Sequence, residues 1–386
     1  MFDYLARHTV LTDMSTIAVC RSSVSLPYGR WACLLACCIT LVPAFGAATF
    51  DELARQASAA RAADRVPEAI ELYQQALQLK PDWPEGWFYL GTLFYDSDRY
   101  ADAQPAFAQF VNLADKPAGW AFLGLCEFET GGYTLAQEHL RKALDGGLAP
   151  EIEQVVRFHE ALLLTRLGLF DQALHWYKAL VRRGVHDPML IAGLGLNSLD
   201  RPMLPGHIPP DQQEFIAAVG RTSYAWMSDD DAKAEAAFHA LLEAYPAAPG
   251  VHNLYATFLL SAHPDAAQRE LRRELKVNPQ CVDARAMLAL LLMQAGQVSE
   301  ASSYAKKAAE DGPTSALAQY AYGSILADPK EAAEHLEIAE RLDPSNYEYH
   351  IALAHAYSKS GRNDDARRER KISINLAKQS ESRGPS

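Results

Sequence analysis

Histidine and acidic residues are the side chains whose spacing could support metal or acid–base chemistry in this sequence. His159-Glu160 begins like the zinc-helix motif HExxH, but no second histidine follows at the required step. His335, His350 and His355 lie close together, yet His350 and His355 are five residues apart and so fall on different faces of a helix. We therefore interpret these histidines as packing or surface residues and predict no metal site.

The acidic run Asp229-Asp230-Asp231 comes directly before a predicted helix. Because carboxylates at a helix N-terminus interact favourably with the helix dipole, a helix cap explains this run more simply than a cation site. The sequence has no phosphate-binding Gly-Lys-Ser loop, no GxSxG elbow and no CxxCH motif. We therefore predict that the protein is not an enzyme and uses no cofactor.

The elements that carry these side chains follow a helical pattern, clearest in WFYLGTLFYDSDRYADAQPAF at residues 87–107. Its opening W-x2-L-G-x2-F uses steps of three and four, which return to one face of a helix. The turn formers at 96–98 interrupt the pattern, and Ala103 and Phe107 mark the inner face of a second helix. The stretch predicts two antiparallel helices, which Gly91 allows to approach closely.

This helical pair recurs at a period near 34 residues, as expected because one pair cannot bury its own apolar face. Matching residues include Leu53, Ala57 and Tyr73; Trp120, Leu123, Gly124 and Leu140; Ala161, Gly168 and Tyr177; Leu288, Ala289 and Gly296; Tyr322, Gly323 and Ala339; and Leu353, Ala354 and Gly361. Prolines near the ends of repeats should stop one helix before the next begins: Pro81, Pro246, Pro279, Pro313 and Pro344. Pro105 is expected near the start of its helix, where a missing N–H costs least.

The pattern W-x2-L-G-x2-Y…A-x3-F…P resembles that of the tetratricopeptide repeat (TPR) family. Residues 84–107 match it closely, with Phe94 in place of Tyr, and the resemblance covers roughly residues 50–378. It implies an all-α solenoid of helical hairpins that forms a right-handed superhelix. Composition agrees, because the chain is 49% hydrophobic and rich in Ala, Leu and Glu, with few strand-like runs of Val, Ile and Thr.

The period fails in LNSLDRPMLPGHIPPDQ, residues 196–212, which holds four prolines. We predict an N-terminal array over 49–200, a Pro-rich loop over 201–211, a C-terminal array with a capping helix over 212–378, and a disordered tail over 379–386. The two arrays could form separate sub-arrays. The loop is either a hinge or binding loop, or a tolerated surface insertion.

Residues 1–48 are predicted to be a leader with a secretory signal peptide. Arg30 precedes an apolar core at 31–42, and small residues at 43–48 follow at cleavage spacing. The core is too short for a comfortable membrane span. We predict cleavage near Gly46–Ala48 and a periplasmic or secreted protein, with a membrane-anchored protein as the alternative.

Two cysteines, Cys126 and Cys281, belong to the repeats, and four would leave with the signal: Cys20, Cys33, Cys37 and Cys38. Because each solenoid repeat contacts only its neighbours, Cys126 and Cys281 should not meet. The sequence therefore predicts no disulfide framework. Both cysteines are expected to behave as small buried or half-buried apolar residues.

Charge narrows the choice of partners. The formal net charge of −12 repels nucleic acid and anionic head groups. The basic cluster Arg367, Arg368, Arg370 and Lys371 fits the solvated face of a capping helix better than a nucleic-acid patch. We predict protein or peptide partners, no nucleic acid, no small-molecule substrate, and membrane contact only through an uncleaved leader.

The resemblance also implies a binding groove, because in TPR proteins the first helix of each repeat lines the concave face. Carried over repeat by repeat, the candidate groove residues are Phe88, Thr92, Tyr95, Leu125, Phe128, Phe158, Leu162, His252, Leu290 and Tyr320. Aromatic residues in such a groove could anchor an extended peptide or a partner helix. The alternative is that some of them pack against the second helices.

These observations together predict a non-enzymatic scaffold that mediates protein–protein interactions outside the cytoplasm. One alternative is a structural subunit of an envelope or secretion complex, held through its convex face. Another is an accessory protein that binds envelope polymers. A cytoplasmic or membrane-anchored adaptor would follow if the leader is not cleaved.

Overall fold

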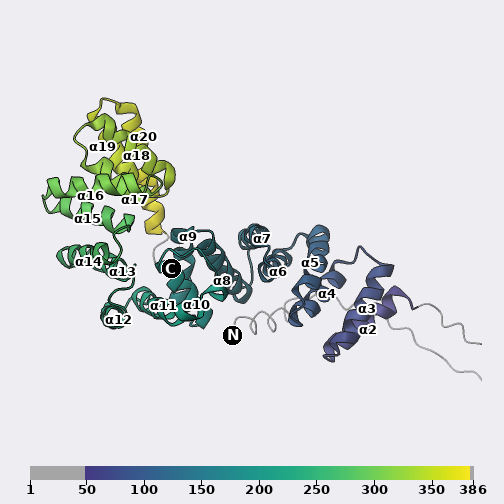
Figure 1. The fold of residues 1–386 in the computed structure, drawn as a ribbon. Coiled ribbons are helices and arrows are strands. Elements are labelled where there is room, and N and C mark those ends of the chain that lie inside the picture. The colour runs from purple at the N-terminus through teal and green to yellow at the C-terminus, as the bar shows by residue number, and fades with distance from the viewer. Residues whose placement is uncertain (1–47, 383–386) are drawn as a thin grey trace, which may run out of the picture. The chain divides into compact units, whose positions relative to one another are not determined.

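The computed structural model describes residues 48–382, and within this range every regular element is a helix (Figure 1). The predicted all-α class is confirmed. The predicted signal peptide core at 31–42 lies outside the described residues. Helix α2 begins at Phe50, where the hydroxyl of Thr49 accepts a hydrogen bond from the Glu52 N–H and caps the helix.

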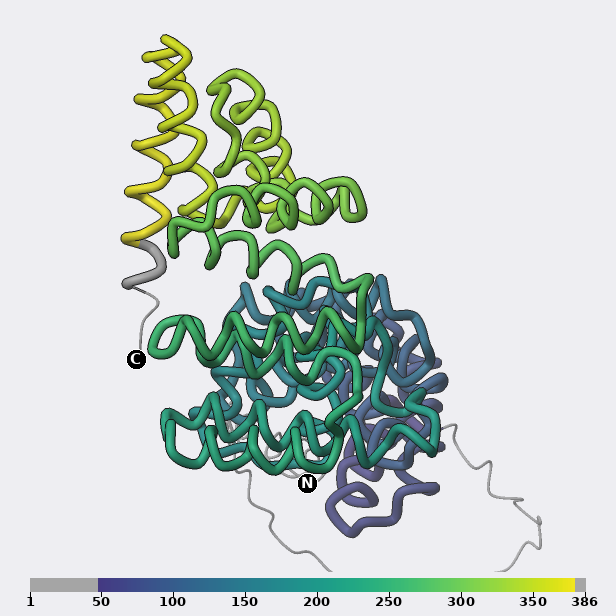
Figure 2. Tube along the Cα trace, turned by 60° about the vertical axis from the view of Figure 1, so that its left-hand side comes forward, coloured from purple at the N-terminus to yellow at the C-terminus, as the bar shows by residue number. Residues whose placement is uncertain are grey.

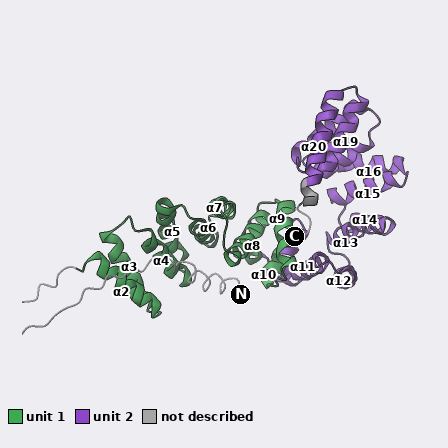
Figure 3. Cartoon of the chain, turned by 180° about the vertical axis from the view of Figure 1, so that it is seen from behind, with its two compact units in different colours: residues 1–193, 202–207 green, residues 194–201, 208–386 purple. Residues whose placement is uncertain are grey.

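The described part of the chain divides into two compact units (Figure 3). Unit 1 comprises the residues up to Gly193 and Pro202–His207, and unit 2 comprises Leu194–Arg201 and the residues from Ile208 on. The predicted Pro-rich loop contains two short 3₁₀ helices, η1 (Pro205–His207) and η2 (Pro210–Gln212). Prolines preset φ for such tight turns but cannot supply the N–H groups of a longer helix.

Unit 1 consists of helical hairpins that follow one another along the chain. They are α2 (Phe50–Ala62) with α3 (Val66–Leu79), α4 (Pro84–Asp96) with α5 (Tyr100–Ala114), α6 (Pro117–Glu129) with α7 (Tyr133–Asp145), and α8 (Pro150–Arg166) with α9 (Phe170–Arg182). The close approach predicted at Gly91 is confirmed, because a Cβ there would lie 2.8 Å from the ring of Phe107. Helix α10 (Pro188–Ser198) follows and crosses into unit 2.

Unit 2 continues with five more hairpins, which the Cα trace shows as paired coils (Figure 2). They are α11 (Gln213–Met227) with α12 (Asp231–Ala244), α13 (Val251–Leu259) with α14 (Pro264–Val277), α15 (Val282–Gln294) with α16 (Val298–Asp311), α17 (Ala316–Ile325) with α18 (Pro329–Leu342), and α19 (Tyr347–Lys359) with α20 (Asn363–Ser382). Helix α20 runs beyond the predicted end at 378. Its sequence has no helix breaker before Gly384-Pro385.

Local signals set several of these boundaries. The cap predicted for the acidic run is confirmed, because the Asp230 carboxylate accepts a hydrogen bond from the Lys233 N–H at 3.1 Å and α12 begins at Asp231. The turn between α6 and α7 passes through Gly131 at φ +84°, a conformation that favours glycine. The prediction for Pro105 was wrong. This proline is the sixth residue of α5, so it removes one backbone hydrogen bond from inside a helix that nevertheless continues.

Aromatic side chains fill much of the space between successive helices. In unit 1 the ring of Phe107 stacks on that of Phe122 with centroids 5.2 Å apart. In unit 2 the ring of Phe238 packs against those of Tyr255 and Phe258, with centroids 5.1 and 5.0 Å away. Such offset contacts add to the free energy gained by burying the rings.

A repeated hydrogen bond ties the first helix of a hairpin to the turn before it. In each case a side chain donates to the carbonyl of a proline six residues earlier: Trp87 to Pro81, His252 to Pro246, Arg285 to Pro279, Gln319 to Pro313, and His350 to Pro344. These are the prolines that the sequence placed at the ends of repeats. They end one helix and also present a carbonyl that fixes the next one.

In five hairpins a first-helix residue also contacts the seventh residue of the second helix. We call the two a crossing pair. These pairs are Trp120 with His139, Arg157 with Trp176, His252 with Glu270, Gln319 with His335, and His350 with Glu369. Three of them, those of His252, Gln319 and His350, combine the crossing contact with the hydrogen bond to a proline carbonyl, so the side chain is held from two sides.

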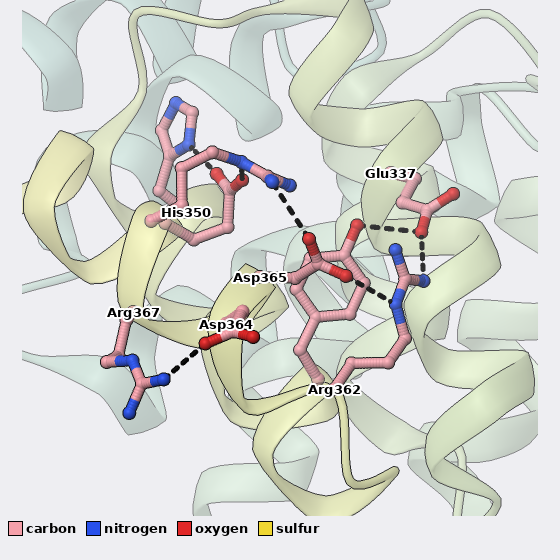
Figure 4. Close-up of polar contacts among 9 residues, drawn as sticks. Glu337, His350, Arg362, Asp364, Asp365 and Arg367 are labelled. Carbon is pink, nitrogen blue, oxygen red and sulfur yellow. Dashed lines mark hydrogen bonds and ion pairs between the residues drawn. The ribbon is translucent and has the colours of Figure 1, made fainter.

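The last hairpin carries the predicted capping face (Figure 4). Arg362 donates to Glu337 of α18 at 2.9 Å and to Asp365 at 2.8 Å. Arg368 also donates to Asp365 at 2.8 Å, and Arg367 pairs with Asp364. The basic residues are thus partly balanced by acidic neighbours, and Arg370 and Lys371 are exposed.

Candidate binding surface

The structure buries six of the ten predicted groove residues: Phe88, Tyr95, Leu125, Phe158, Leu162 and His252. Phe88 fills space between hairpins, with its ring centroid 4.9 Å from that of Phe110. Tyr95 lies against Phe122 at 5.3 Å. These side chains can shape a groove only from beneath, because a partner cannot contact them without a change in packing.

The other four predicted groove residues are half-buried: Thr92, Phe128, Leu290 and Tyr320. Phe128 contacts His159 with ring centroids 4.9 Å apart, and Tyr320 contacts Tyr349 at the same distance. The Thr92 hydroxyl donates to the carbonyl of Tyr89 at 2.9 Å. Their partly exposed atoms are what the first helices offer a partner, and their role in binding stays a prediction.

Two furrows in unit 1 lie on either side of α5. The first has a volume of about 510 Å³ and is lined by Gln74, Leu77, Gln78, Trp87, Leu90, Phe94, Asp102, Pro105 and Ala106. The second has a volume of about 400 Å³ and is lined by Gln104, Pro105, Ala108, Val111, Asn112, Trp120, Leu123, Glu127 and His139. Pro105 lines both, so we call them together the α5 furrows.

Each furrow is formed by two consecutive second helices, with the first helix between them as its floor. The first furrow lies among α3, α4 and α5, and the second among α5, α6 and α7. A small side chain helps to open the first furrow. Ala106 occupies the crossing position opposite Trp87, where the next hairpin has His139 opposite Trp120.

The tryptophans in the furrow floors are fixed by hydrogen bonds. The indole N–H of Trp87 donates to the Pro81 carbonyl at 2.8 Å, and that of Trp120 donates to Asp115 at 2.7 Å. The Lys142 ammonium lies 3.6 Å from the centroid of the Trp120 ring, which adds a cation–π contact. Fixed aromatic surface of this kind costs little entropy to bind against.

The furrow walls are rich in side-chain amides. Gln74 and Gln78 project from α3, while Gln104 and Asn112 project from α5. An amide can both donate and accept hydrogen bonds, as the backbone of a bound peptide requires. The furrows therefore combine an apolar floor with walls suited to a peptide. The sequence pattern assigned Trp87 and Trp120 only to packing, and nothing in it indicated which second-helix residues would stand around them.

Three acidic side chains, Glu127, Glu160 and Asp283, have raised pKa values. Glu127 of the second furrow contacts Nδ1 of His139 at 2.7 Å, and burial, partly offset by that histidine, raises the pKa of the carboxyl. Burial raises the pKa of Glu160 to about 7. Burial also raises the pKa of Asp283, which accepts a hydrogen bond from Ser315 at 3.2 Å. Their contacts are those of structural groups within and between hairpins.

In the part of the chain that the structure describes, no three or more His, Cys, Asp and Glu residues come together as a metal ion would require. Among the same residues, no helix combines the length and apolar character needed to span a membrane. Cys126 is buried and Cys281 half-buried, as predicted.

Successive hairpins with small residues at their crossings, proline-terminated turns and an open furrow define a helical-repeat protein. The sequence matches the TPR repeat family over residues 59–98 and the tetratricopeptide repeat family over 88–151, 261–316 and 287–328. Segments of both units thus match tetratricopeptide repeats, a family whose members are typically non-enzymatic scaffolds for protein–protein interactions. No curated protein is significantly similar to the chain in sequence.

Several solved structures resemble parts of the chain. MamA (residues 41 to the end) from Desulfovibrio magneticus RS-1 is 15% identical, with 43% of this chain and 96% of that chain covered and a TM-score of 0.35. Another MamA crystal structure is 16% identical, with 42% and 96% covered and a TM-score of 0.34. The APC/C hetero-tetramer Cut9–Hcn1 is 16% identical, with 85% and 66% covered and a TM-score of 0.39.

Proposed function

We propose that the protein is a non-enzymatic scaffold that binds a segment of a partner protein in the α5 furrows. The observation that carries the proposal is the pair of furrows, in which Trp87 and Trp120 form fixed apolar floors beneath amide-rich walls. Buried aromatic anchors supply most of the binding free energy in typical protein interfaces, while surrounding polar groups exclude water. Furrows that share the Pro105 edge suit an extended segment that crosses α5.

The charge of the furrows indicates what kind of segment would bind. Asp102 lines the first furrow and Glu127 the second, and the whole chain has a net charge of −12. An acidic segment would be repelled during the encounter, whereas a basic one would be attracted and a neutral one would not be repelled. The partner segment should therefore carry apolar side chains for the tryptophan floors and no excess of acidic residues.

We also propose that this scaffold acts outside the cytoplasm. The proposal rests on the leader pattern: a basic residue, an apolar core and small residues directly before the first repeat. Expression of the full chain with an affinity tag after Ser386, followed by cell fractionation and mass spectrometry of the N-terminus, tests it. An envelope product that starts between Ala47 and Phe50 supports export, and an intact cytoplasmic chain contradicts it.

Two matched substitutions on α5 test binding in the furrows. Gln104 lines the second furrow, whereas Gln109 is exposed on the same helix and lines neither. Partners would be captured on the immobilised full chain, identified by mass spectrometry and assayed individually by titration. We expect Q104A to weaken binding roughly tenfold and Q109A to leave it within about twofold, because only Gln104 can form a hydrogen bond with a segment in the furrow.

Circular dichroism melting of both variants provides the folding control. Equal binding by Q104A, Q109A and the parent chain would contradict the furrow proposal. In that case photo-cross-linking from Thr92 and Phe128, on the first helices, would show whether the partner contacts the predicted groove instead. Cell fractionation tests export and the binding titrations test the furrows, so either proposal can be rejected without the other.

A further inference from the structure

His350 in the last hairpin has a hydrogen-bond acceptor at each ring nitrogen. Its Nδ1 lies 2.8 Å from a carboxylate oxygen of Glu369, and its Nε2 lies 3.0 Å from the carbonyl oxygen of Pro344. A neutral imidazole carries only one N–H, whereas an imidazolium carries two. Because a carbonyl and a carboxylate can only accept, the positively charged ring is the form that satisfies both contacts.

His252 repeats this geometry three hairpins earlier in the same unit. Its Nδ1 lies 2.7 Å from Glu270, and its Nε2 lies 3.1 Å from the carbonyl oxygen of Pro246. Both histidines are buried, and so are both glutamates. Each histidine is therefore a crossing-pair residue that also holds the turn leading into its own helix.

The charged groups around His350 favour the imidazolium. Glu369 of α20 contacts the ring and is itself 3.1 Å from Arg368, while Glu340 of α18 adds a more distant negative charge. Burial alone would lower the pKa of His350, but the hydrogen bonds to Pro344 and Glu369 outweigh burial and raise that pKa above its ordinary value. A raised pKa means that the stabilisation is complete below about pH 6.5 and is lost as the pH rises through the higher value.

Charged side chains also surround His252. From α14, Glu270 contacts the ring and also pairs with Arg273 at 2.6 Å. Glu274 of the same helix accepts hydrogen bonds from the backbone N–H groups of Gly250 and Asn253, beside the histidine. From α12, His239 lies against Tyr255 of α13, with ring centroids 5.7 Å apart.

In two other hairpins of unit 2, the side chain that donates to the proline carbonyl does not titrate near neutral pH. Arg285 donates to the Pro279 carbonyl and to Asp311, and guanidinium groups stay charged in proteins. Gln319 donates to the Pro313 carbonyl at 3.3 Å, while its Oε1 contacts Nδ1 of His335 at 2.7 Å. These two turns are internal controls for any effect of pH on the histidine turns.

We propose that His350 is a proton-dependent clamp, which holds α19 on the turn that precedes it only while its ring is doubly protonated. When the ring loses a proton, one of its two acceptors faces a lone pair and the turn loosens. The adjoining hairpins then become free to change their packing on one another. The stiffness of unit 2 therefore depends on pH at the His350 junction and is independent of pH at the Arg285 and Gln319 junctions.

Nuclear magnetic resonance on the full chain with ¹⁵N-labelled histidine tests the charge state directly. Long-range ¹H–¹⁵N spectra distinguish a doubly protonated ring from either neutral tautomer, and the variant H350Q assigns the His350 signal by its loss. We expect the His350 ring to be doubly protonated at pH 6.5. A bare ring nitrogen on His350 at that pH would overturn the proposal.

Hydrogen-exchange protection, corrected for the intrinsic effect of pH, tests the consequence. Between pH 6 and pH 9 we expect protection in the first turn of α19 to fall about tenfold, the effect of losing one hydrogen bond to a charged group. Protection in the first turn of α15, behind Arg285, should change less than twofold. Equal changes at both helices would mean that pH acts on the whole unit, and the clamp would be rejected.

A double variant gives the last hairpin a donor to the turn that does not titrate. H350Q/E369H places at the last hairpin the Gln–His crossing pair that Gln319 and His335 form in the hairpin before it. A neutral histidine satisfies this pair, so we expect protection of α19 to stay constant from pH 7 to pH 9. A pH response of α19 that persists in a folded double variant would also contradict the clamp.

Discussion

The imidazole Nδ1 of His335 lies 2.7 Å from the amide oxygen of Gln319, at the crossing position where the next hairpin pairs His350 with Glu369. The two hairpins thus fill the same crossing position with different polar pairs, an amide with a histidine in one and a histidine with a carboxylate in the other. Where the TPR pattern has tryptophan, unit 2 has histidine, arginine or glutamine, and each donates to a proline carbonyl. Because a buried polar side chain is tolerated only when its hydrogen bonds are made, the second helix must supply a matching partner.

Replacement of Glu160 should reveal the cost of a buried carboxylate in unit 1. Burial raises its pKa to about 7, and its Oε2 has no hydrogen-bond partner. The stability that depends on Glu160 is therefore complete below the ordinary pKa of 4.5, where Glu160 is neutral in both the folded and the unfolded state. This stability is lost progressively as the pH rises through about 7. E160Q keeps a neutral side chain, so it should exceed the parent in stability by up to about 3 kcal/mol at pH 8 and by less than about 1 kcal/mol at pH 5.

Urea denaturation at the two pH values measures this difference. E151Q, on the exposed side of the same helix, serves as the control and should change stability by less than about 0.5 kcal/mol at both. A gain for E160Q that is the same at pH 5 and pH 8 would show that ionisation of Glu160 is not its cause.

Gly195 is expected to tolerate no side chain. A Cβ at this position would lie 2.1 Å from the carbonyl oxygen of Ile216, so α10 and α11 would have to separate. G195A should therefore destabilise unit 2 by about 1–3 kcal/mol, the usual cost of overpacking. G206A is the matched control, because a Cβ there meets no atom within 4 Å. Thermal melts that place the two variants at the same midpoint would refute the predicted clash.

Glu274 should be important for the start of α13. Its carboxylate is fully buried and accepts from the N–H groups of Gly250 at 2.8 Å and Asn253 at 3.3 Å. E274A leaves both donors unpaired and should cost about 2–4 kcal/mol, while E274Q retains an acceptor and should cost less. Urea unfolding of both variants measures the difference, and a harmless E274A would exclude this capping role.

The two thiols of the repeats should react slowly while the protein is folded. Burial raises the pKa of Cys281 to about 11 and also raises the pKa of the buried Cys126 thiol. Since the thiolate is the reactive form, Cys281 should react with a disulfide reagent at pH 8 roughly 100-fold more slowly than in urea, and Cys126 more slowly still. Rapid modification of either native thiol, followed by peptide mapping, would contradict the burial described here.

The sequence alone determined the helical hairpins and their repetition. Residues at steps of three and four set the buried face of each helix, and prolines such as Pro313 and Pro344 ended one repeat before the next. Gly91 indicated a close crossing, and Asp230 indicated a helix cap. These signals are local, because they depend on backbone geometry and on neighbours within a few residues.

Tertiary structure decided which side chains a partner can contact. Phe88 and Tyr95 were predicted to line a groove, yet rings from α5 and α6 cover them. The sequence also gave no sign that His350 would meet Glu369 or that Ala106 would open a furrow beside Trp87. Such contacts join residues on different helices, so they depend on the angle and depth at which hairpins pack. The 3.6-residue period fixes the buried face of a helix, but the neighbouring hairpin determines what covers that face.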